Sequence, residues 1–167
     1  MQLFWVEFAS AFGFGLLASL VPVFNAETFI VATVATGLIG PAPLGIGLGL
    51  GQGLGKAILF QLTRQGKKLP WLKRRKPQEP EKDVGKWRLR WRWLVKKSVS
   101  LLEHRGWGPV VVFASGAISV PPNYATTLVA GTTRVNAWMF GTMMTLGYVS
   151  RNLVEALIFA GVLSAWL

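Results

Sequence analysis

Almost all of the charge in this 167-residue chain lies in one segment. Residues 64–105 hold 15 of the 18 Lys and Arg residues and 4 of the 7 acidic residues, so the segment has a net charge of +11. The other 125 residues carry six charged side chains, which sum to zero: Glu7, Glu27, Lys56, Arg134, Arg151 and Glu155. Six charges could not cover the water-exposed surface of a soluble domain of this size. The distribution therefore predicts an integral membrane protein.

The chain lacks the residues, or the spacing of residues, that several classes of function require. It has no Cys, which excludes thiol chemistry and a disulfide scaffold. Its single histidine, His104, lies in the basic segment, and no His or acidic cluster has the spacing of a metal site. Ser115 and Ser119 have no His near them in the sequence. We therefore expect no catalytic residues, no metal, no cofactor and no enzymatic activity.

The basic segment separates two apolar halves, residues 1–63 and 106–167. Residues 21–32 align with residues 120–130, with one gap and six identities in the same order. Internal repeats with broken helices are how many transporters build a binding site near the midplane of the membrane. We therefore expect an all-α fold with an inverted repeat.

Proline-containing breaks divide each half. Pro22 and Asn25 interrupt any helix in the first half, and the 13 residues that follow, 28–40, would span about 20 Å, short of the hydrocarbon core of about 30 Å. Residues 121–123 make the same break in the second half. Each break predicts a re-entrant helical loop, around residues 22–27 and 121–123, whose free backbone groups face protein or a wet cavity.

Two longer segments remain as candidate transmembrane helices. Residues 43–62 are long enough for one crossing, and residues 135–167 would form one long tilted helix or a pair kinked at Gly141 and Gly147. Between residues 45 and 55, glycine occupies every second position, which places two stripes of small residues on neighbouring faces of one helix. Small residues let helices approach closely in lipid, so we expect this helix to pack on two sides.

The basic segment itself, residues 64–105, has two parts. Residues 67–83 are typical of a solvated linker, whereas the residues from 86 onward have Trp and Leu at roughly helical spacing. A basic amphipathic helix suits anionic lipid head groups, although basic and aromatic strings also bind nucleic acids. Because the segment joins two membrane halves, we expect lipid and no nucleic acid, on the cytoplasmic side. The expected head-group surface is Arg88, Arg90, Arg92, Lys96 and Lys97.

Glu27 is the first candidate functional residue. It follows the Pro22 break, beside Asn25, in a stretch that is otherwise uncharged from residue 8 to residue 55. Ionisable groups inside a membrane are costly, so such a carboxyl is a candidate proton carrier or cation partner. The alternative is that the break lies at the membrane interface, where Glu27 only touches water.

Arg151 and Glu155 form the second candidate. They are four residues apart in residues 135–167, so they can pair on one face of a helix. The pair could be structural, or Arg151 could bind a phosphate, because its planar guanidinium suits bidentate contact with phosphate oxygens. Asn123 and Tyr124, together with Asn152, could add hydrogen bonds.

These features resemble the DedA, or VTT-domain, family of membrane proteins, over residues 8–64 and 103–167. Residues 22–27 look like the family's proline-containing loop ending in Glu, and residues 51–66 are similar to its Gly-rich helix. Residues 104–131 resemble its second loop, but the family often has Arg-x-x-Pro-x-x-Arg there. This chain lacks both arginines, so Arg151 would have to replace them from another helix.

The resemblance implies two re-entrant loops that meet head to head in the bilayer of a bacterial cytoplasmic membrane. It also implies movement of lipids between leaflets, either phospholipids or a polyprenyl phosphate carrier, with coupling to protons in some members. The expected pathway is lined by Asn25, Glu27, Asn123, Tyr124, Arg151 and Glu155. Two alternatives stay open: a proton-coupled transporter of a small solute or ion, and a non-transporting membrane scaffold.

Overall fold

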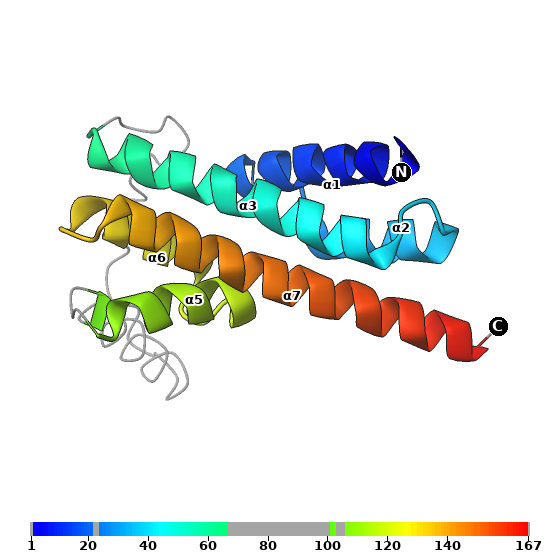
Figure 1. The fold of residues 1–167 in the computed structure, drawn as a ribbon. Coiled ribbons are helices and arrows are strands. Elements are labelled where there is room, and N and C mark those ends of the chain that lie inside the picture. Colours follow the sequence, from blue (N-terminus) through cyan, green and yellow to red (C-terminus); the bar gives the residue numbers. More distant parts are fainter. Residues whose placement is uncertain (1, 22–23, 67–100, 103–105, 167) are drawn as a thin grey trace, which may run out of the picture.

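A computed structural model describes residues 2–21, 24–66, 101–102 and 106–166, and these residues contain helices and no strand (Figure 1). The all-helical class predicted from the sequence is therefore confirmed. The helices are α1 (Gln2–Leu20), α2 (Ala26–Thr36), α3 (Pro41–Arg64), α5 (Gly108–Ile118), α6 (Asn123–Thr132) and α7 (Ala137–Trp166).

Local sequence explains where α2 begins and ends and where α3 begins. Asn25 caps α2, because its side-chain oxygen accepts a hydrogen bond from the Glu27 amide at 2.9 Å. Gly37 ends α2 in the left-handed conformation, with φ of 64°. Pro41 then opens α3, in the first turn, where its missing N–H is no loss.

Helix length separates two groups of helices. α1 and α7 contain apolar windows, Leu3–Leu20 and Ala137–Ala165, that are long enough to cross a membrane, and only 22% of each window is buried. A core helix of a soluble protein would be mostly buried. α7 is one continuous helix through Gly141 and Gly147, so it is not a kinked pair. These two candidate spans support association with a membrane.

The other helices differ from this pair. α2, α5 and α6 have 11, 11 and 10 residues, so each is about 15–17 Å long and too short to cross. α3 has 24 residues, about 36 Å, but it is not among the two candidate spans, so the predicted crossing by residues 43–62 stays a prediction. α1, with 19 residues, is much longer than α5, so the first helices of the two halves differ in length.

The two long helices α3 and α7 run antiparallel, side by side, along the centre of the molecule (Figure 1). In each half, the first helix packs on the long helix of the same half: α1 on α3, and α5 on α7. The short second helix packs instead on the long helix of the other half, so α2 contacts α7 and α6 contacts α3. The halves are therefore joined by the α3–α7 contact and by this exchange of short helices.

The alternating glycines create the close contacts around α3. Two stripes face different neighbours: Gly45, Gly49 and Gly53 face α7, and Gly47, Gly51 and Gly55 face α1. A Cβ atom added at Gly49 would lie 2.5 Å from Val149 Cα, and one at Gly51 would lie 2.1 Å from the carbonyl oxygen of Phe12. Any larger residue would push the helices apart. The prediction that this helix packs on two sides is confirmed.

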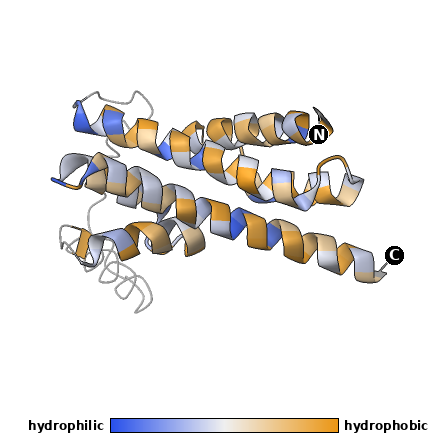
Figure 2. Ribbon diagram, in the orientation of Figure 1, coloured by the Kyte–Doolittle hydropathy of each residue, from blue (hydrophilic) through white to orange (hydrophobic). Residues whose placement is uncertain are grey.

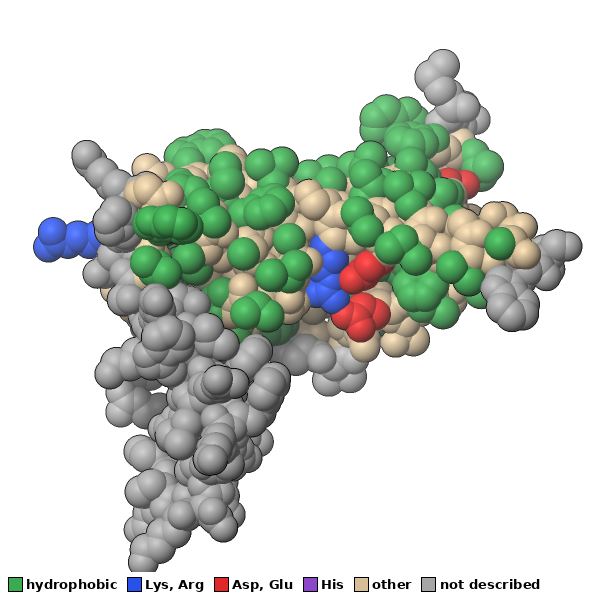
Figure 3. All heavy atoms as spheres, turned by 90° about the horizontal axis from the view of Figure 1, so that it is seen from below, with side chains coloured by type: hydrophobic (Ala, Val, Ile, Leu, Met, Phe, Trp, Pro, Cys, Tyr) green, Lys and Arg blue, Asp and Glu red, His purple; other side chains and the backbone are tan. Residues whose placement is uncertain are grey.

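Two apolar clusters form the core, one toward each end of α3 and α7. One includes Phe60 and Phe140, whose rings stack at 4.6 Å, and the other includes Leu44 and Leu48. The outer surface is also apolar, and large side chains such as Trp138 are exposed. Hydrophobic residues dominate the ribbon, with hydrophilic residues near the middle of α7 (Figure 2). On one face, a cluster of acidic and basic side chains interrupts a mostly hydrophobic surface (Figure 3).

Candidate functional site

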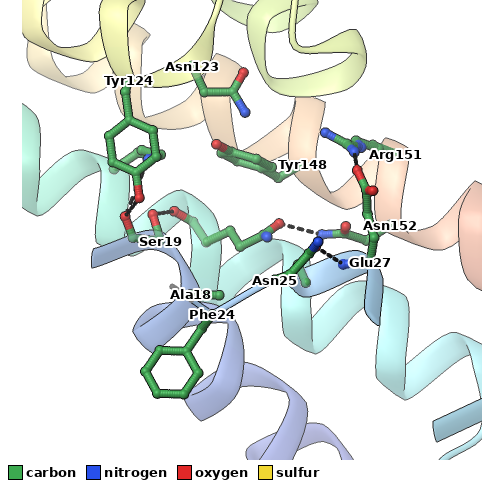
Figure 4. A pocket seen from close by; sticks show the side chains of 13 residues that line it. Ala18, Ser19, Phe24, Asn25, Glu27, Asn123, Tyr124, Tyr148, Arg151 and Asn152 are labelled. Atoms are coloured by element: carbon green, nitrogen blue, oxygen red, sulfur yellow. Dashed lines mark hydrogen bonds and ion pairs between the residues drawn. The ribbon is translucent and has the colours of Figure 1, made fainter. Parts of the chain in front are cut away.

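A polar cavity of about 240 Å³ lies between the two apolar clusters, where the two halves meet (Figure 4). α1, α2, α3, α6 and α7 all contribute to its wall, and the N-terminal ends of α2 and α6 both reach it. The residues that line the cavity are Ala18, Ser19, Phe24, Asn25, Ala26, Glu27, Gln52, Lys56, Asn123, Tyr124, Tyr148, Arg151 and Asn152.

Five of the six expected pathway residues line this cavity, and the sixth is bonded to one of them. Those that line it are Asn25, Glu27, Asn123, Tyr124 and Arg151. Glu155 does not line it, but accepts a hydrogen bond of 2.7 Å from Nε of Arg151. The predicted pair four residues apart on one helix is therefore present.

Arg151 is held on three sides. Besides Glu155, it donates a hydrogen bond of 2.6 Å from a terminal guanidinium nitrogen to Ser119 Oγ and forms an ion pair with Glu27. These contacts connect α7 to α2 and to the connection between α5 and α6. The Glu27 side chain is 61% exposed and that of Arg151 is 21% exposed, so Glu27 lies at the mouth of the cavity. Glu27 therefore lies at the surface of the molecule and is also tied to the site, and its position at a membrane interface stays a prediction.

Lys56 is the functional candidate that the sequence interpretation missed. The residue is only 1% exposed, and it lines the cavity. Its Nζ atom donates a hydrogen bond of 3.3 Å to the carbonyl oxygen of Ser19 and lies 3.0 Å from the centre of the Tyr124 ring. The Tyr124 hydroxyl donates to the same carbonyl at 2.8 Å. The ammonium is thus stabilised by a carbonyl in the last turn of α1 and by an aromatic face.

A sequence signal for Lys56 exists. Leu44, Leu48, Gln52 and Lys56 are spaced by four, which puts them on one face of α3, between the two glycine stripes. Because α1 and α7 cover the stripes on either side, this face must be the most enclosed one. A polar pair on that face therefore predicts a buried site.

Amide side chains complete the wall. Asn152 donates a hydrogen bond of 2.7 Å to the side-chain oxygen of Gln52, and the two residues are 2% and 9% exposed. Ser19 donates to the backbone oxygen of Gln52 at 3.0 Å. These bonds hold α1, α3 and α7 together at the cavity, and they satisfy polar groups that would otherwise be buried without partners.

One group of expected residues lies outside the described part of the chain. Arg88, Arg90, Arg92, Lys96 and Lys97, the expected lipid head-group surface, fall within residues 67–100. The same holds for Pro22, which was expected to break the first half.

In the described residues, fold and site together define an all-helical protein with two candidate membrane-spanning helices and a polar cavity that opens on a mostly apolar exterior. No family model matches the chain, and no curated protein and no solved structure matches it. Neither membership of the DedA family nor the inverted re-entrant repeat is tested by these comparisons, and both stay predictions.

Proposed function

We propose that this protein moves lipids, or lipid-linked phosphates such as a polyprenyl phosphate, between the two leaflets of a membrane. The observation that carries the proposal is the polar cavity, because both halves build it inside an otherwise apolar exterior. A lipid head group needs polar partners while it crosses hydrocarbon, and the acyl chains need an apolar surface beside them.

The arrangement of the short helices supports this proposal. α2 and α6 both begin at the cavity, as expected for two re-entrant loops that meet head to head in a fold of the DedA type. We place the protein in a bacterial cytoplasmic membrane, with the basic residues 64–105 on the cytoplasmic side, near anionic lipid heads. The protein needs no enzymatic step for this activity.

Glu27 and Arg151 take the role of a polar gate at the mouth of the cavity. Arg151 shares its guanidinium among Glu27, Glu155 and Ser119, so a passing phosphate would compete with Glu27 for it. Protonation of Glu27 would release Arg151 in the same way, which gives a route for coupling to protons. Without the Glu27 charge, Glu27 could no longer displace the phosphate from Arg151 once it is bound, so passage should slow.

The test is a lipid-exchange assay with the purified protein in liposomes that contain a phospholipid labelled on its head group. A membrane-impermeant quencher is added, and the loss of signal is compared with that of protein-free vesicles. We expect a larger loss with protein, no leakage of a trapped dye, and a strong reduction by Glu27→Gln. Glu7→Gln is the matched control, because Glu7 bonds the Gly40 amide at 3.1 Å and does not line the cavity.

A loss of signal equal to that of protein-free vesicles would contradict phospholipid transport. The same assay with a labelled polyprenyl phosphate would then decide whether lipid-linked phosphates are moved instead. Failure of both would favour the two alternatives, a proton-coupled transporter of small solutes or a scaffold.

A further inference from the structure

Lys56 is a buried basic residue with which no carboxylate of the described residues forms an ion pair. Its contacts there are the Ser19 carbonyl oxygen, at the long distance of 3.3 Å, and the face of the Tyr124 ring. A carbonyl dipole and a ring quadrupole stabilise an ammonium less than a full negative charge does. Lys56 would therefore stabilise an anion in the cavity more than a cation that already has carboxylate partners would.

Arg151 is that paired cation. Two carboxylates and one hydroxyl occupy its guanidinium, so an anion could bind it only by displacing one of them. The group formed by Arg151, Glu27 and Glu155 also carries a formal excess of negative charge. Lys56, rather than Arg151, is thus the cation of this cavity that is poised to hold an anion.

The rest of the wall offers further donors. The cavity is lined by Asn25, Asn123 and Asn152, and each side-chain amide has two N–H donors. One N–H of Asn123 bonds Ser119 Oγ and one of Asn152 bonds Gln52, so each of these two amides keeps a second donor. The N-terminal ends of α2 and α6 also reach it, and the N–H groups at a helix N-terminus favour negative charge. No side chain caps the N-terminus of α6 with a hydrogen bond.

An apolar groove adjoins the polar cavity. Its volume is about 410 Å³, and it is lined by Phe14, Phe24, Asn25, Thr28, Phe29 and Ala32, from α1, α2 and the connection between them. Phe24 and Asn25 line both the groove and the cavity, so the two spaces share a wall. The rings of Phe14 and Phe29 stack at 3.9 Å and give the groove a rigid apolar side.

We propose that the cavity and the groove form one binding site for an anionic lipid, with its phosphate held by Lys56 and an acyl chain lying along the groove between α1 and α2. The choice of a lipid, rather than a free anion, rests on the proposed function and on the shared wall of the two spaces. The site selects for head groups whose net charge is negative, because the cation of a zwitterionic head group would compete with Lys56 for the phosphate.

Equilibrium binding to the purified full-length protein in a non-ionic detergent tests the charge requirement. The probes are dioctanoyl phosphatidic acid, dioctanoyl phosphatidylcholine and inorganic phosphate, each titrated by calorimetry. We expect phosphatidic acid to bind at least tenfold more tightly than the other two. Lys56→Gln should weaken its binding by about tenfold or more, since a charge-assisted hydrogen bond contributes about 1.5–3 kcal/mol.

Two variants control for the effect of the substitution itself. Arg134→Gln removes an exposed positive charge away from the cavity and should leave the affinity unchanged. Lys56→Arg keeps the charge and should retain most of the affinity. Gel filtration and circular dichroism establish that each variant is folded. If Lys56→Gln binds phosphatidic acid as tightly as the unmodified protein, or if phosphatidylcholine binds equally well, the proposal is overturned.

The groove has its own test. Ala32→Phe should fill the groove and weaken the binding of phosphatidic acid at least fivefold, without changing the binding of inorganic phosphate. Val31→Phe is the matched control, because it adds a similar side chain on α2 outside the groove and should have little effect on either. Inorganic phosphate binding as tightly as the lipid, with no effect of Ala32→Phe, would refute the lipid part and leave a free-anion site. Intact lipid binding without lipid exchange in liposomes would overturn the proposed function and leave this site standing.

Discussion

The close contact between α3 and α7 at Gly49 makes a sharp prediction for Gly49→Ala. The added Cβ would lie 2.5 Å from Val149 Cα and 2.7 Å from the Val149 backbone nitrogen, whereas carbon atoms in contact are normally about 3.5–4.0 Å apart. The helices must therefore separate by about 1 Å, since the obstacle is backbone and cannot rotate away. Separation also weakens the neighbouring contacts of Gly45 and Gly53.

Two opposing terms set the size of the effect. Overpacking of this kind costs about 1–3 kcal/mol, while replacing Gly by Ala inside a helix gains about 1 kcal/mol in propensity. We expect Gly49→Ala to lower the free energy of unfolding by up to about 2 kcal/mol. Gly13→Ala, in the middle of α1 with nothing within 4 Å of its added Cβ, should instead raise it by up to about 1 kcal/mol.

The assay is chemical unfolding in detergent, followed by the fluorescence of the chain's eight tryptophans. The opposite signs of the two substitutions are the essential result. Equal stabilisation by both would refute the tight α3–α7 contact, because only the helix propensity would then remain.

Three further predictions concern the site. Glu155→Gln should lower the free energy of unfolding by about 1–2 kcal/mol, as measured by chemical unfolding. This is less than the cost of breaking a fully buried ion pair, because Arg151 keeps its pair with Glu27 and the Arg151 and Glu155 side chains are about a quarter exposed. Asn152→Leu should cost about 1–3 kcal/mol by leaving the Gln52 amide without its partner, and a second Gln52→Leu change should recover part of that loss. Glu27→Cys, the only thiol in the chain, should react with a small polar thiol reagent in liposomes, and complete protection would contradict a water-filled mouth.

The glycine pattern predicted much of the packing from the sequence alone. Because Gly alternates with larger residues, two faces of α3 carry only glycine and allow another helix to approach closely. α1 packs on one of these faces and α7 on the other. The breaks at residues 22–27 and 121–123 likewise predicted short segments after them, and the short helices α2 and α6 begin there, although Pro22 itself lies outside the described residues. α2 ends at Thr36, earlier than the expected segment 28–40, because Gly37 adopts the left-handed conformation.

Glu7 is tolerated within α1 for a reason that sequence spacing does not show. The helix begins at Gln2 and includes Glu7 as its one charged residue. The reason is tertiary, because the Glu7 carboxylate accepts a hydrogen bond from the Gly40 amide, 33 residues away. A charge with such a partner can sit within an apolar helix.

The ion-pair network shows the same division between local and tertiary information. The bond from Arg151 to Glu155 follows from their spacing on one helix, and it was predicted. The pair between Arg151 and Glu27 joins residues 124 apart in the sequence, so no spacing rule could predict it. Lys56 was missed for a different reason: its burial is visible only when the face between the two glycine stripes is considered as a third stripe.

The position of the polar cavity follows from the lengths of the helices. α3 and α7 are about 36 and 45 Å long, whereas α2 and α6 are each about 15–17 Å, so neither short helix can cover the long helix on which it packs. Because each packs on the long helix of the other half and begins at the cavity, their N-terminal ends face one space near the middle. The first N–H groups of a helix lack partners within it, so apolar side chains could not fill that space without leaving donors unsatisfied. Four of the six charges outside residues 64–105 lie in this region for that reason. Two short helices begin there, and water, side chains or an anion must bond their first N–H groups.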